Sequence, residues 1–364
     1  MASENPFLEA LPTRHTRGDF SREEVALANR NSGIALETLR YDLTPVGLHY
    51  LLIHFDIPHL EADTFRLSVG GLVARPLSLS LDDLRALPRR TERVTLECAG
   101  NGRGQVEPRY QSMPWSYEAV GTAEWTGTPL ANVLTAAGLD ERAAEIVFYG
   151  ADRGFDRHGE HTYGRSLAPA HALRDEVLLV YEMNGMPLLP QHGFPLRLVV
   201  PGWFGMASVK WLERIEVWDR PFDGPQQTPH YHFRTVAGEP GTPVTTLRVK
   251  SLMVPPGLPD VYTRRRVVER GDVEIVGRAW SGAGAAIARV EVAVDGVWRE
   301  ANLDAPMGRF AWRGWKFHWR AEAGLHELAC RATDIDGNVQ PLDPVWDVGG
   351  FGNNAVQRVQ VMVR

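Results

Sequence analysis

The sequence predicts an α+β protein in which a mixed α+β domain is followed by an all-β, immunoglobulin-like sandwich. From Tyr41 onward, short apolar runs with period two alternate with short helical segments, and Pro and Gly interrupt them. After Arg270 the pattern changes to alternating strands separated by hairpin turns. We therefore divide the chain into an N-terminal arm (1–40), a mixed α+β domain (41–236), and a linker followed by a sandwich (237–364).

The arm and the first domain differ in their hydrophobic pattern. Residues 1–40 are polar and mixed in charge, which is typical of an extended or partly helical arm. Residues 65–69 alternate with period two and end in Gly70-Gly71, as a strand followed by a turn does. Ser80, followed by two acidic residues, predicts the start of a short helix over 80–87. Similar patterns predict a helix over 130–137 and strands over 93–97, 145–149, 176–182 and 195–200.

The second half begins with a stretch rich in Pro and Gly. Five prolines fall between positions 237 and 259, which indicates a linker or an irregular crossing between domains. Strands are predicted beyond it over 273–279, 288–294, 310–320, 326–333 and 355–363. Asp295-Gly296 and Asp336-Gly337 are dipeptides typical of tight turns between strands. Short strands joined in this way are typical of an immunoglobulin-like sandwich.

The composition excludes several functional classes. The 364 residues are 44% hydrophobic and 23% charged, which is ordinary for a globular protein with two cores. The formal net charge is −6 without a basic stripe, so we expect no nucleic-acid binding. No apolar run approaches the ~20 residues of a membrane span, and residues 1–10 lack a signal-peptide pattern. We expect a cytoplasmic protein, or a periplasmic one if a signal peptide was removed before this numbering starts.

The chain contains two cysteines, Cys98 and Cys330, which are too few for a disulfide framework. Cys330 lies inside the predicted strand 326–333 and fits a buried, inert thiol. Cys98 directly follows a strand and enters the glycine-rich segment 98–104, whose spacing does not fit a dinucleotide-binding loop. Main-chain N–H groups there and the nearby Arg103 would favour a thiolate, which is a soft ligand for a transition metal. A buried packing cysteine is the alternative.

The residues around Cys98 resemble a known family. Leu-Glu-Cys-Ala-Gly-Asn at 96–101 looks like the metal-ligand motif of the sulfite oxidase family of molybdopterin-dependent oxidoreductases. Residues 191–202 and 208–212 resemble its molybdopterin-binding segment, and 181–185, Trp115, Trp125, 279–282 and 338–341 also fit. The resemblance runs in order from about residue 43 to the C-terminus. It implies a molybdenum-molybdopterin cofactor, a catalytic domain over 41–236 and a homodimer formed through the C-terminal domain.

The resemblance also implies which residues form the site. Cys98 is the implied ligand to molybdenum, and Tyr231 is the implied active-site tyrosine, whose phenol can assist proton movement. The implied cofactor contacts are Tyr50, His54, Cys98, Asp152, His192, Arg197, Ser208, Val209 and Lys210. Cationic or hydrogen-bonding groups at 192, 197 and 210 suit the cofactor's phosphate, and a carboxylate at 152 could accept from pterin N–H groups. Taken singly, these residues also fit a turn histidine, a surface arginine, a solvated lysine and a packing tyrosine.

Two histidine pairs have spacings found among zinc ligands. These are His158-x-x-His161 and His230-x-His232. Neither pair has enough further ligands in the sequence to complete a convincing zinc site.

The implied substrate pocket departs from the family pattern. It comprises Leu52, Arg103, Trp115 and Gly349. Leu52 and Gly349 stand where the family has pocket arginines, and Gly102 where it has a further basic residue, so Arg103 is the arginine retained. Each arginine–oxyanion contact contributes roughly 1.5–3 kcal/mol, so losing two would weaken sulfite binding by about two to four orders of magnitude. We expect poor activity on sulfite, or a larger or less anionic substrate.

The resemblance therefore predicts an oxidoreductase that performs two-electron oxygen-atom transfer, with sulfite or a related sulfur compound as the leading substrate. Cys98 would hold the metal, Arg103 would orient the substrate, and Tyr231 would donate a hydrogen bond beside the metal. No Cys-x-x-Cys-His haem motif occurs, so an external electron acceptor such as a cytochrome is expected. Two alternatives remain: a reductase of sulfoxide-type substrates on the same cofactor, and a non-catalytic, immunoglobulin-like interaction protein.

Overall fold

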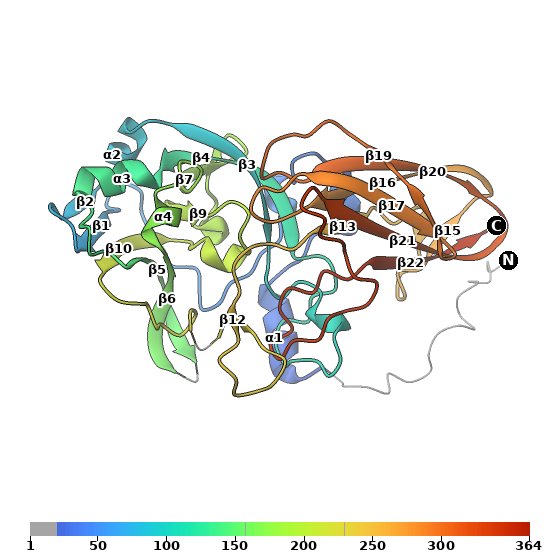
Figure 1. Cartoon of the computed structure of the whole chain (residues 1–364), viewed down its shortest axis with the longest axis horizontal. Helices are drawn as coiled ribbons and strands as arrows, with labels where there is room; N and C mark the ends of the chain where they lie inside the picture. Colours follow the sequence, from blue (N-terminus) through green and yellow to red (C-terminus); the bar gives the residue numbers. More distant parts are fainter. Residues whose placement is uncertain (1–19, 157, 229) are drawn as a thin grey trace.

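The computed structural model describes residues 20–156, 158–228 and 230–364, and these form two parts that pack side by side (Figure 1). The first part contains mixed sheets and short helices, and the second is built from strands. This arrangement confirms the predicted order of a mixed α+β domain followed by an all-β sandwich. Part of the predicted arm, residues 1–19, lies outside the described residues.

The helices are short and lie in the N-terminal two thirds of the chain. The α-helices are α1 (Arg22–Arg30), α2 (Leu81–Ala86), α3 (Leu130–Ala137) and α4 (Pro169–Ala172). The 3-10 helices are η2 (Leu36–Arg40), η3 (Val46–Leu48), η4 (Arg103–Gln105), η5 (Pro190–His192) and η6 (Gly205–Ala207). Ser80 caps α2 as predicted, because its hydroxyl accepts from Asp83 N while the Asp83 carboxylate accepts from Ser80 N. None of the described helices is long and apolar enough to cross a lipid bilayer.

Two sheets form the first part, with strand orders β2-β1-β10-β5-β6 and β3-β4-β7-β8, and β9 pairs with β7. The strands are β1 (Leu67–Gly71), β2 (Leu77–Leu79), β3 (Arg90–Glu97), β4 (Val120–Pro129), β5 (Glu145–Asp156), β6 (Gly159–Leu167), β7 (Leu178–Met183), β8 (Met186–Pro187), β9 (Arg197–Val199) and β10 (Leu212–Trp218). β5 runs beyond the predicted 145–149 because, after an irregularity between Tyr149 and Arg153, it continues as a hairpin with β6.

The sandwich consists of two sheets, with strand orders β13-β16-β20-β19 and β14-β15-β22-β21-β17-β18, preceded by a small ribbon of β11 and β12. The strands are β11 (His232–Phe233), β12 (Thr242–Pro243), β13 (Lys250–Met253), β14 (Leu258–Pro259), β15 (Arg266–Val268), β16 (Gly271–Trp280), β17 (Ile287–Val294), β18 (Val297–Glu300), β19 (Asn302–Leu303), β20 (Arg313–Ala321), β21 (Gly324–Asp334) and β22 (Gln357–Val363). Side chains of both sheets, among them Ile275, Val290 and Phe317, pack into one core. The five strands predicted after Arg270 are all present.

The stretch from 237 to 259 is only partly a linker. Its middle forms strand β13, which is buried at every position and pairs with β16, placing Lys250 opposite Trp280. The prolines and glycines that suggested a linker lie on either side of this strand. Burial of Leu252 in the core of the first part and of Met253 in the core of the sandwich favours a strand here.

Strand β3 forms one of the contacts between the two parts, and it lies between them in Figure 1. The main-chain N–H of Thr95 donates to the carbonyl of Phe310 at 2.9 Å, and the Thr95 hydroxyl accepts from the N–H of Trp312 at 2.8 Å. The buried indole of Trp312 donates to the carbonyl of Asp42 at 2.7 Å. Trp280 and Trp312 belong to the same apolar core as the first part, so this interface is continuous with that core.

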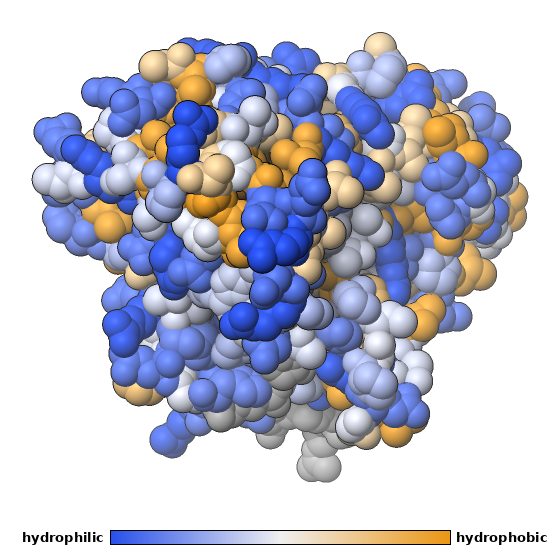
Figure 2. Space-filling view, turned by 60° about the vertical axis from the view of Figure 1, so that its left-hand side comes forward, coloured by the Kyte–Doolittle hydropathy of each residue, from blue (hydrophilic) through white to orange (hydrophobic). Residues whose placement is uncertain are grey.

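The outer surface is mainly hydrophilic. On the face shown in Figure 2, apolar residues gather in small patches between charged and polar ones. Several exposed apolar side chains belong to the sandwich, including Leu258, Val261 and Tyr262. Most of the large apolar side chains are instead committed to the cores described above.

Replacing Trp312 tests how much the interface contributes to the free energy of unfolding. We expect Trp312→Ala to lower the free energy of unfolding by about 3–5 kcal/mol, because it leaves a large cavity and an unpaired carbonyl at Asp42. Urea unfolding followed by tryptophan fluorescence measures this loss. Tyr262→Ala serves as the control, because Tyr262 is 87% exposed and its loss should change the value by less than about 0.5 kcal/mol. A loss below about 1 kcal/mol for Trp312→Ala would contradict the prediction.

Candidate active site

The loop after β3 presents the Cys98 side chain at the border of the two parts. Hydrogen bonds fold the loop tightly, from the N–H of Asn101 to the carbonyl of Cys98 and from the N–H of Arg103 to the carbonyl of Gly100. A Cβ at Gly100 would lie 2.5 Å from the Arg103 guanidinium, and Gly102 has a φ of +91°. The backbone at Gly102 therefore favours glycine, and a side chain at Gly100 would displace the Arg103 guanidinium.

Cys98 is 8% exposed and packs with Met113, Trp115 and Ala119. Burial raises the pKa of the Cys98 thiol, and this effect outweighs the opposing effects of Arg103 and the Trp115 indole. The expectation that the loop and Arg103 favour a thiolate is therefore wrong for the metal-free cavity, because desolvation is the larger effect. A metal that binds here has to displace the proton from the thiol.

Cys330 has a different environment. Both cysteines are free thiols, and Cys330 is completely buried in β21, where its thiol donates to the carbonyl of Ser251 at 3.5 Å. Burial raises the pKa of Cys330 to about 12. The prediction of an inert, packed thiol at this position is confirmed.

A cavity opens beside Cys98, with about 650 Å³ of space that is not filled by atoms and that includes open solvent. It is lined by residues of the segments around β3, β5, β6 and β9 and of the loop before β11. Of the predicted site residues, it brings together Tyr50, Leu52, His54, Cys98, Asp152, His192, Arg197, Ser208, Lys210 and Tyr231. Val209 lies next to this lining, but its side chain is buried in the core of the first part.

Two cationic side chains, the buried Arg197 and the partly buried Lys210, line the cavity. Arg197 donates to the carbonyls of His192 and Ser208, at 2.9 and 3.2 Å, and its Nε has no partner. Lys210 Nζ donates to the carbonyls of Leu52 and Gln191, at 2.9 and 3.2 Å. Among residues 20–156, 158–228 and 230–364, no carboxylate forms an ion pair with either of them. The Asp152 carboxyl lines the same cavity but forms no ion pair with either of them, so this arrangement fits the binding of a negatively charged group.

Burial shifts the pKa values of the titratable groups that line the cavity. Burial and the nearby Arg197 lower the pKa of Lys210 to about 7, while burial raises the pKa of Asp152 to about 7. Burial lowers the pKa of His49 to about 4 and that of both His54 and His192 to about 3. His192 is therefore a neutral hydrogen-bonding group, and the positive charge comes from Arg197 and Lys210.

Tyr231 lies at the end of the cavity near Cys98. Its hydroxyl is 3.2 Å from Nε2 of His54, within hydrogen-bonding distance, and its ring centroid is 5.1 Å from that of Phe351. Burial and the proximity of Cys98 raise the pKa of the Tyr231 phenol, so it keeps its proton at neutral pH. The guanidinium of Arg165 lies 5.6 Å from the Tyr231 ring centroid and donates to the carbonyl of Gln226.

Sequence reasoning missed several residues of the site. His49, Tyr163 and Gln191 line the cavity, and Arg165 is buried beside Tyr231. Gln191 lies in a segment that resembles the family's cofactor-binding region, which was the available signal. The position of Arg165 follows from the pairing of β6 with β5, which the sequence pattern does not reveal.

Three predicted pocket residues, Arg103, Trp115 and Gly349, lie outside the lining of this cavity. The buried Arg103 donates to the carbonyls of Gly349 and Met113, each at 2.9 Å. A Cβ at Gly349 would lie 2.5 Å from the ring of Phe351, so this apolar ring occupies the space of a side chain at position 349. Gly102 faces Asn353, whose amide donates to its carbonyl at 2.9 Å.

The histidine pairs do not form a metal centre by themselves. His161 lies 2.6 Å from the Gln226 amide nitrogen and 3.7 Å from the Asp156 carboxylate. In the part of the chain that the structure describes, no group of three or more His, Cys, Asp or Glu residues could hold a metal ion.

Comparisons with known proteins decide the family. Residues 54–226 match the family model of the oxidoreductase molybdopterin binding domain, and residues 242–364 match that of the Mo-co oxidoreductase dimerisation domain. The chain is 37% identical to sulfite oxidase of Gallus gallus over 344 residues, covering 87% of this chain and 72% of that protein. The chain belongs to the sulfite oxidase family. Its residues 54–226 thus form a molybdopterin-binding domain of the oxidoreductase type, which implies a molybdenum-molybdopterin cofactor.

Other relatives are named for different activities. The chain is 39% identical to mitochondrial sulfite oxidase of Homo sapiens, covering 88% of this chain and 62% of that protein. It is 32% identical to nitrate reductase [NADH] of Ulva prolifera, covering 88% of this chain and 40% of that protein. Among solved structures, the sulfane dehydrogenase SoxCD of Paracoccus pantotrophus matches with a TM-score of 0.78 and 25% identity, covering 96% of this chain and 92% of that chain. The chain thus spans 62% of the length of the mammalian sulfite oxidases that it matches.

The net charge of the cavity should change near pH 7. Below pH 7 Lys210 is protonated and Asp152 is neutral, whereas above pH 7 Lys210 loses its proton and Asp152 becomes negative. Sulfate, whose charge is constant in this range, should therefore raise the melting temperature of the cofactor-free protein more at about pH 6 than at about pH 8. Lys210→Met should remove most of this difference. Equal stabilisation by sulfate at both pH values in the unsubstituted protein would contradict the prediction.

Proposed function

We propose that this enzyme oxidises a sulfur compound by two-electron oxygen-atom transfer, with Cys98 as the protein ligand to molybdenum. The observation that carries the proposal is the single cavity that joins the Cys98 thiol to Arg197 and Lys210. One soft ligand and two cationic groups that form no ion pair with a carboxylate of the described residues suit a metal whose remaining ligands belong to an anionic cofactor. The named activities of the sulfite oxidases and of the sulfane dehydrogenase support a sulfur substrate.

Different residues of the cavity would bind different parts of the cofactor. Arg197 and Lys210 would hold its phosphate, and Asp152 would accept hydrogen bonds from its pterin N–H groups. Further contacts would come from Tyr50, His54, His192, Ser208 and Val209. When bound, the cofactor supplies the two-electron redox chemistry and the transfer of the oxygen atom.

The groups near Cys98 would act on the substrate. Tyr231 keeps its proton because burial raises its pKa, so its phenol can donate a hydrogen bond and is oriented by His54. Arg103 would orient the substrate through its charge, although two of its nitrogens already donate to main-chain carbonyls. Electrons would leave to an external acceptor such as a cytochrome, and residues 242–364 would form a homodimer.

The substrate would be less anionic than sulfite, or larger. Leu52 lines the cavity and Phe351 fills the space at Gly349, so apolar groups occupy two positions of the implied pocket. A fully charged oxyanion would lose hydration there without gaining two guanidinium partners. The reductase alternative is supported by the 32% identity to nitrate reductases, and it is distinguished by the direction of turnover. Ferricyanide-linked oxidation of sulfur compounds supports the proposal, whereas turnover only with reduced viologen and a sulfoxide supports the reductase.

Replacing Cys98 tests its role as the metal ligand. We expect Cys98→Ser to abolish turnover and to lower the molybdenum content, while the melting temperature of the protein changes little. Cys330→Ser is the matched control, because the other thiol lies in the sandwich core and should not affect the molybdenum content. Molybdenum is measured by mass spectrometry per chain. Full activity in Cys98→Ser would rule out the ligand role.

Restoring a cation at position 52 tests the substrate pocket. We expect Leu52→Arg to raise kcat/KM for sulfite by about 10–100-fold, because a guanidinium would gain a charge-assisted contact with the oxyanion. Leu48→Arg adds the same charge at a position that is 46% exposed and outside the cavity lining, and should leave kcat/KM unchanged. Steady-state assays with sulfite decide the matter. A micromolar KM for sulfite in the unsubstituted enzyme would contradict the proposed pocket.

A further inference from the structure

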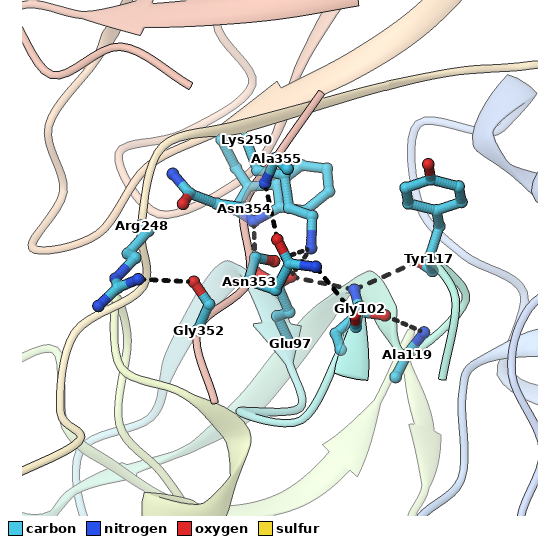
Figure 3. Close-up of polar contacts among 12 residues, drawn as sticks. Glu97, Gly102, Tyr117, Ala119, Arg248, Lys250, Gly352, Asn353, Asn354 and Ala355 are labelled. Atoms are coloured by element: carbon cyan, nitrogen blue, oxygen red, sulfur yellow. Dashed lines mark hydrogen bonds and ion pairs between the residues drawn. The ribbon is translucent and has the colours of Figure 1, made fainter. Parts of the chain in front are cut away.

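Glu97, the residue before Cys98, is a carboxylate buried between the two parts, with 2% of its surface exposed. It accepts three hydrogen bonds. Lys250 Nζ donates to it at 2.8 Å, the Trp280 indole at 2.9 Å and the Asn101 amide at 3.0 Å. Lys250 and Trp280 lie opposite one another on β13 and β16, so the sandwich supplies two of the three donors, and Figure 3 shows Glu97 below Lys250.

The sandwich also holds the rest of the Cys98 loop. Lys250 Nζ donates to the carbonyl of Asn353 at 2.9 Å, and the Asn353 amide donates to the carbonyl of Gly102 at 2.9 Å. The N–H of Gly352 donates to the carbonyl of Ala99 at 2.7 Å. Figure 3 shows that the segment carrying Gly352 and Asn353 runs directly over this loop. The loop that carries Cys98 is therefore bound from the sandwich at Glu97, Ala99 and Gly102.

A short relay connects Glu97 to Cys98 on the side of the first part. The amide of Asn101 donates to the Glu97 carboxylate, and its carbonyl oxygen accepts from the N–H of Ala119 at 3.1 Å. The carbonyl of Ala119 accepts from the N–H of Cys98 at 2.9 Å. A displacement of the Glu97 carboxylate would therefore shift both ends of the turn that presents the thiol.

We propose that Lys250 of the sandwich is a positioning residue for Cys98, so that docking of the sandwich through the Glu97–Lys250 ion pair places the thiol for the metal. The proposal rests on the proposed role of Cys98 as the ligand. Removing Lys250 leaves a buried carboxylate without its counter-ion, which is costly, and movement of the carboxylate toward water reduces this cost. Because Glu97 and Cys98 are adjacent, that movement opens the loop.

The test measures the thiol in the cofactor-free protein, which needs no metal. We expect Lys250→Met to raise the rate of alkylation of Cys98 by iodoacetamide about tenfold, because opening of the loop exposes the sulfur. Cys330 in the same sample is the internal reference. The molybdenum content of the protein isolated with its cofactor should fall to about half or less. In the double variant Glu97→Gln/Lys250→Gln, which removes both charges but keeps hydrogen-bonding groups, both quantities should return to within about twofold of the original values.

A matched control separates positioning from general stability. Glu37 forms ion pairs with Arg264 and Arg266 of the sandwich at 3.2 and 2.9 Å, away from the Cys98 loop. Glu37→Gln should lower the melting temperature without changing the alkylation of Cys98. If Lys250→Met does not fold, Trp280→Phe removes one donor to Glu97 and should still raise the rate about threefold.

Two results would overturn the proposal. One is an alkylation rate of Cys98 in Lys250→Met, or in Trp280→Phe, equal to that in Glu37→Gln. The other is a failure of the double variant to restore the rate. Molybdenum retained in Cys98→Ser would refute the ligand role instead, and the alkylation result would still report how Lys250 positions the thiol.

Discussion

The position of strand β3 between the two parts is the constraint on which the site depends. β4 pairs with β3 from the first part, while Phe310 and Trp312 bind its Thr95 from the sandwich. A strand held from both sides has little freedom at its end, so the loop from Cys98 to Arg103 starts from a fixed point. The glycines of that loop and the carboxylate of Glu97 then determine where the thiol lies.

Charged side chains have different partners at the interface and in the cavity. At the interface, Glu97 and Lys250 satisfy each other, and neutral donors complete the carboxylate's hydrogen bonds. In the cavity, Arg197 and Lys210 have main-chain carbonyls as partners and no carboxylate among the described residues. The first arrangement makes a rigid support, whereas the second leaves attraction for an incoming anion.

Local signals made part of this structure predictable. The capping residues of α2 and the alternation of the sandwich strands needed no tertiary information, and the family resemblance pointed to ten residues that line the cavity. Strand β13 was missed because flanking prolines dominate its composition, although burial determines its conformation. Two contacts could not be predicted: the Phe351 ring lies beside Gly349, and the Arg165 guanidinium lies beside Tyr231. Both depend on how segments far apart in the sequence pack together, and no local sequence pattern indicates this.

The hydrogen bond from Arg103 to the carbonyl of Gly349 joins residues that are 246 positions apart in the chain. During synthesis, the first part leaves the ribosome long before this partner exists. At roughly 5–20 residues per second, the interval is on the order of 10–50 seconds. Throughout it, the Cys98 loop lacks the segment that closes over it. A cofactor that requires the finished site can therefore bind only after the segment around Gly349 has been synthesised.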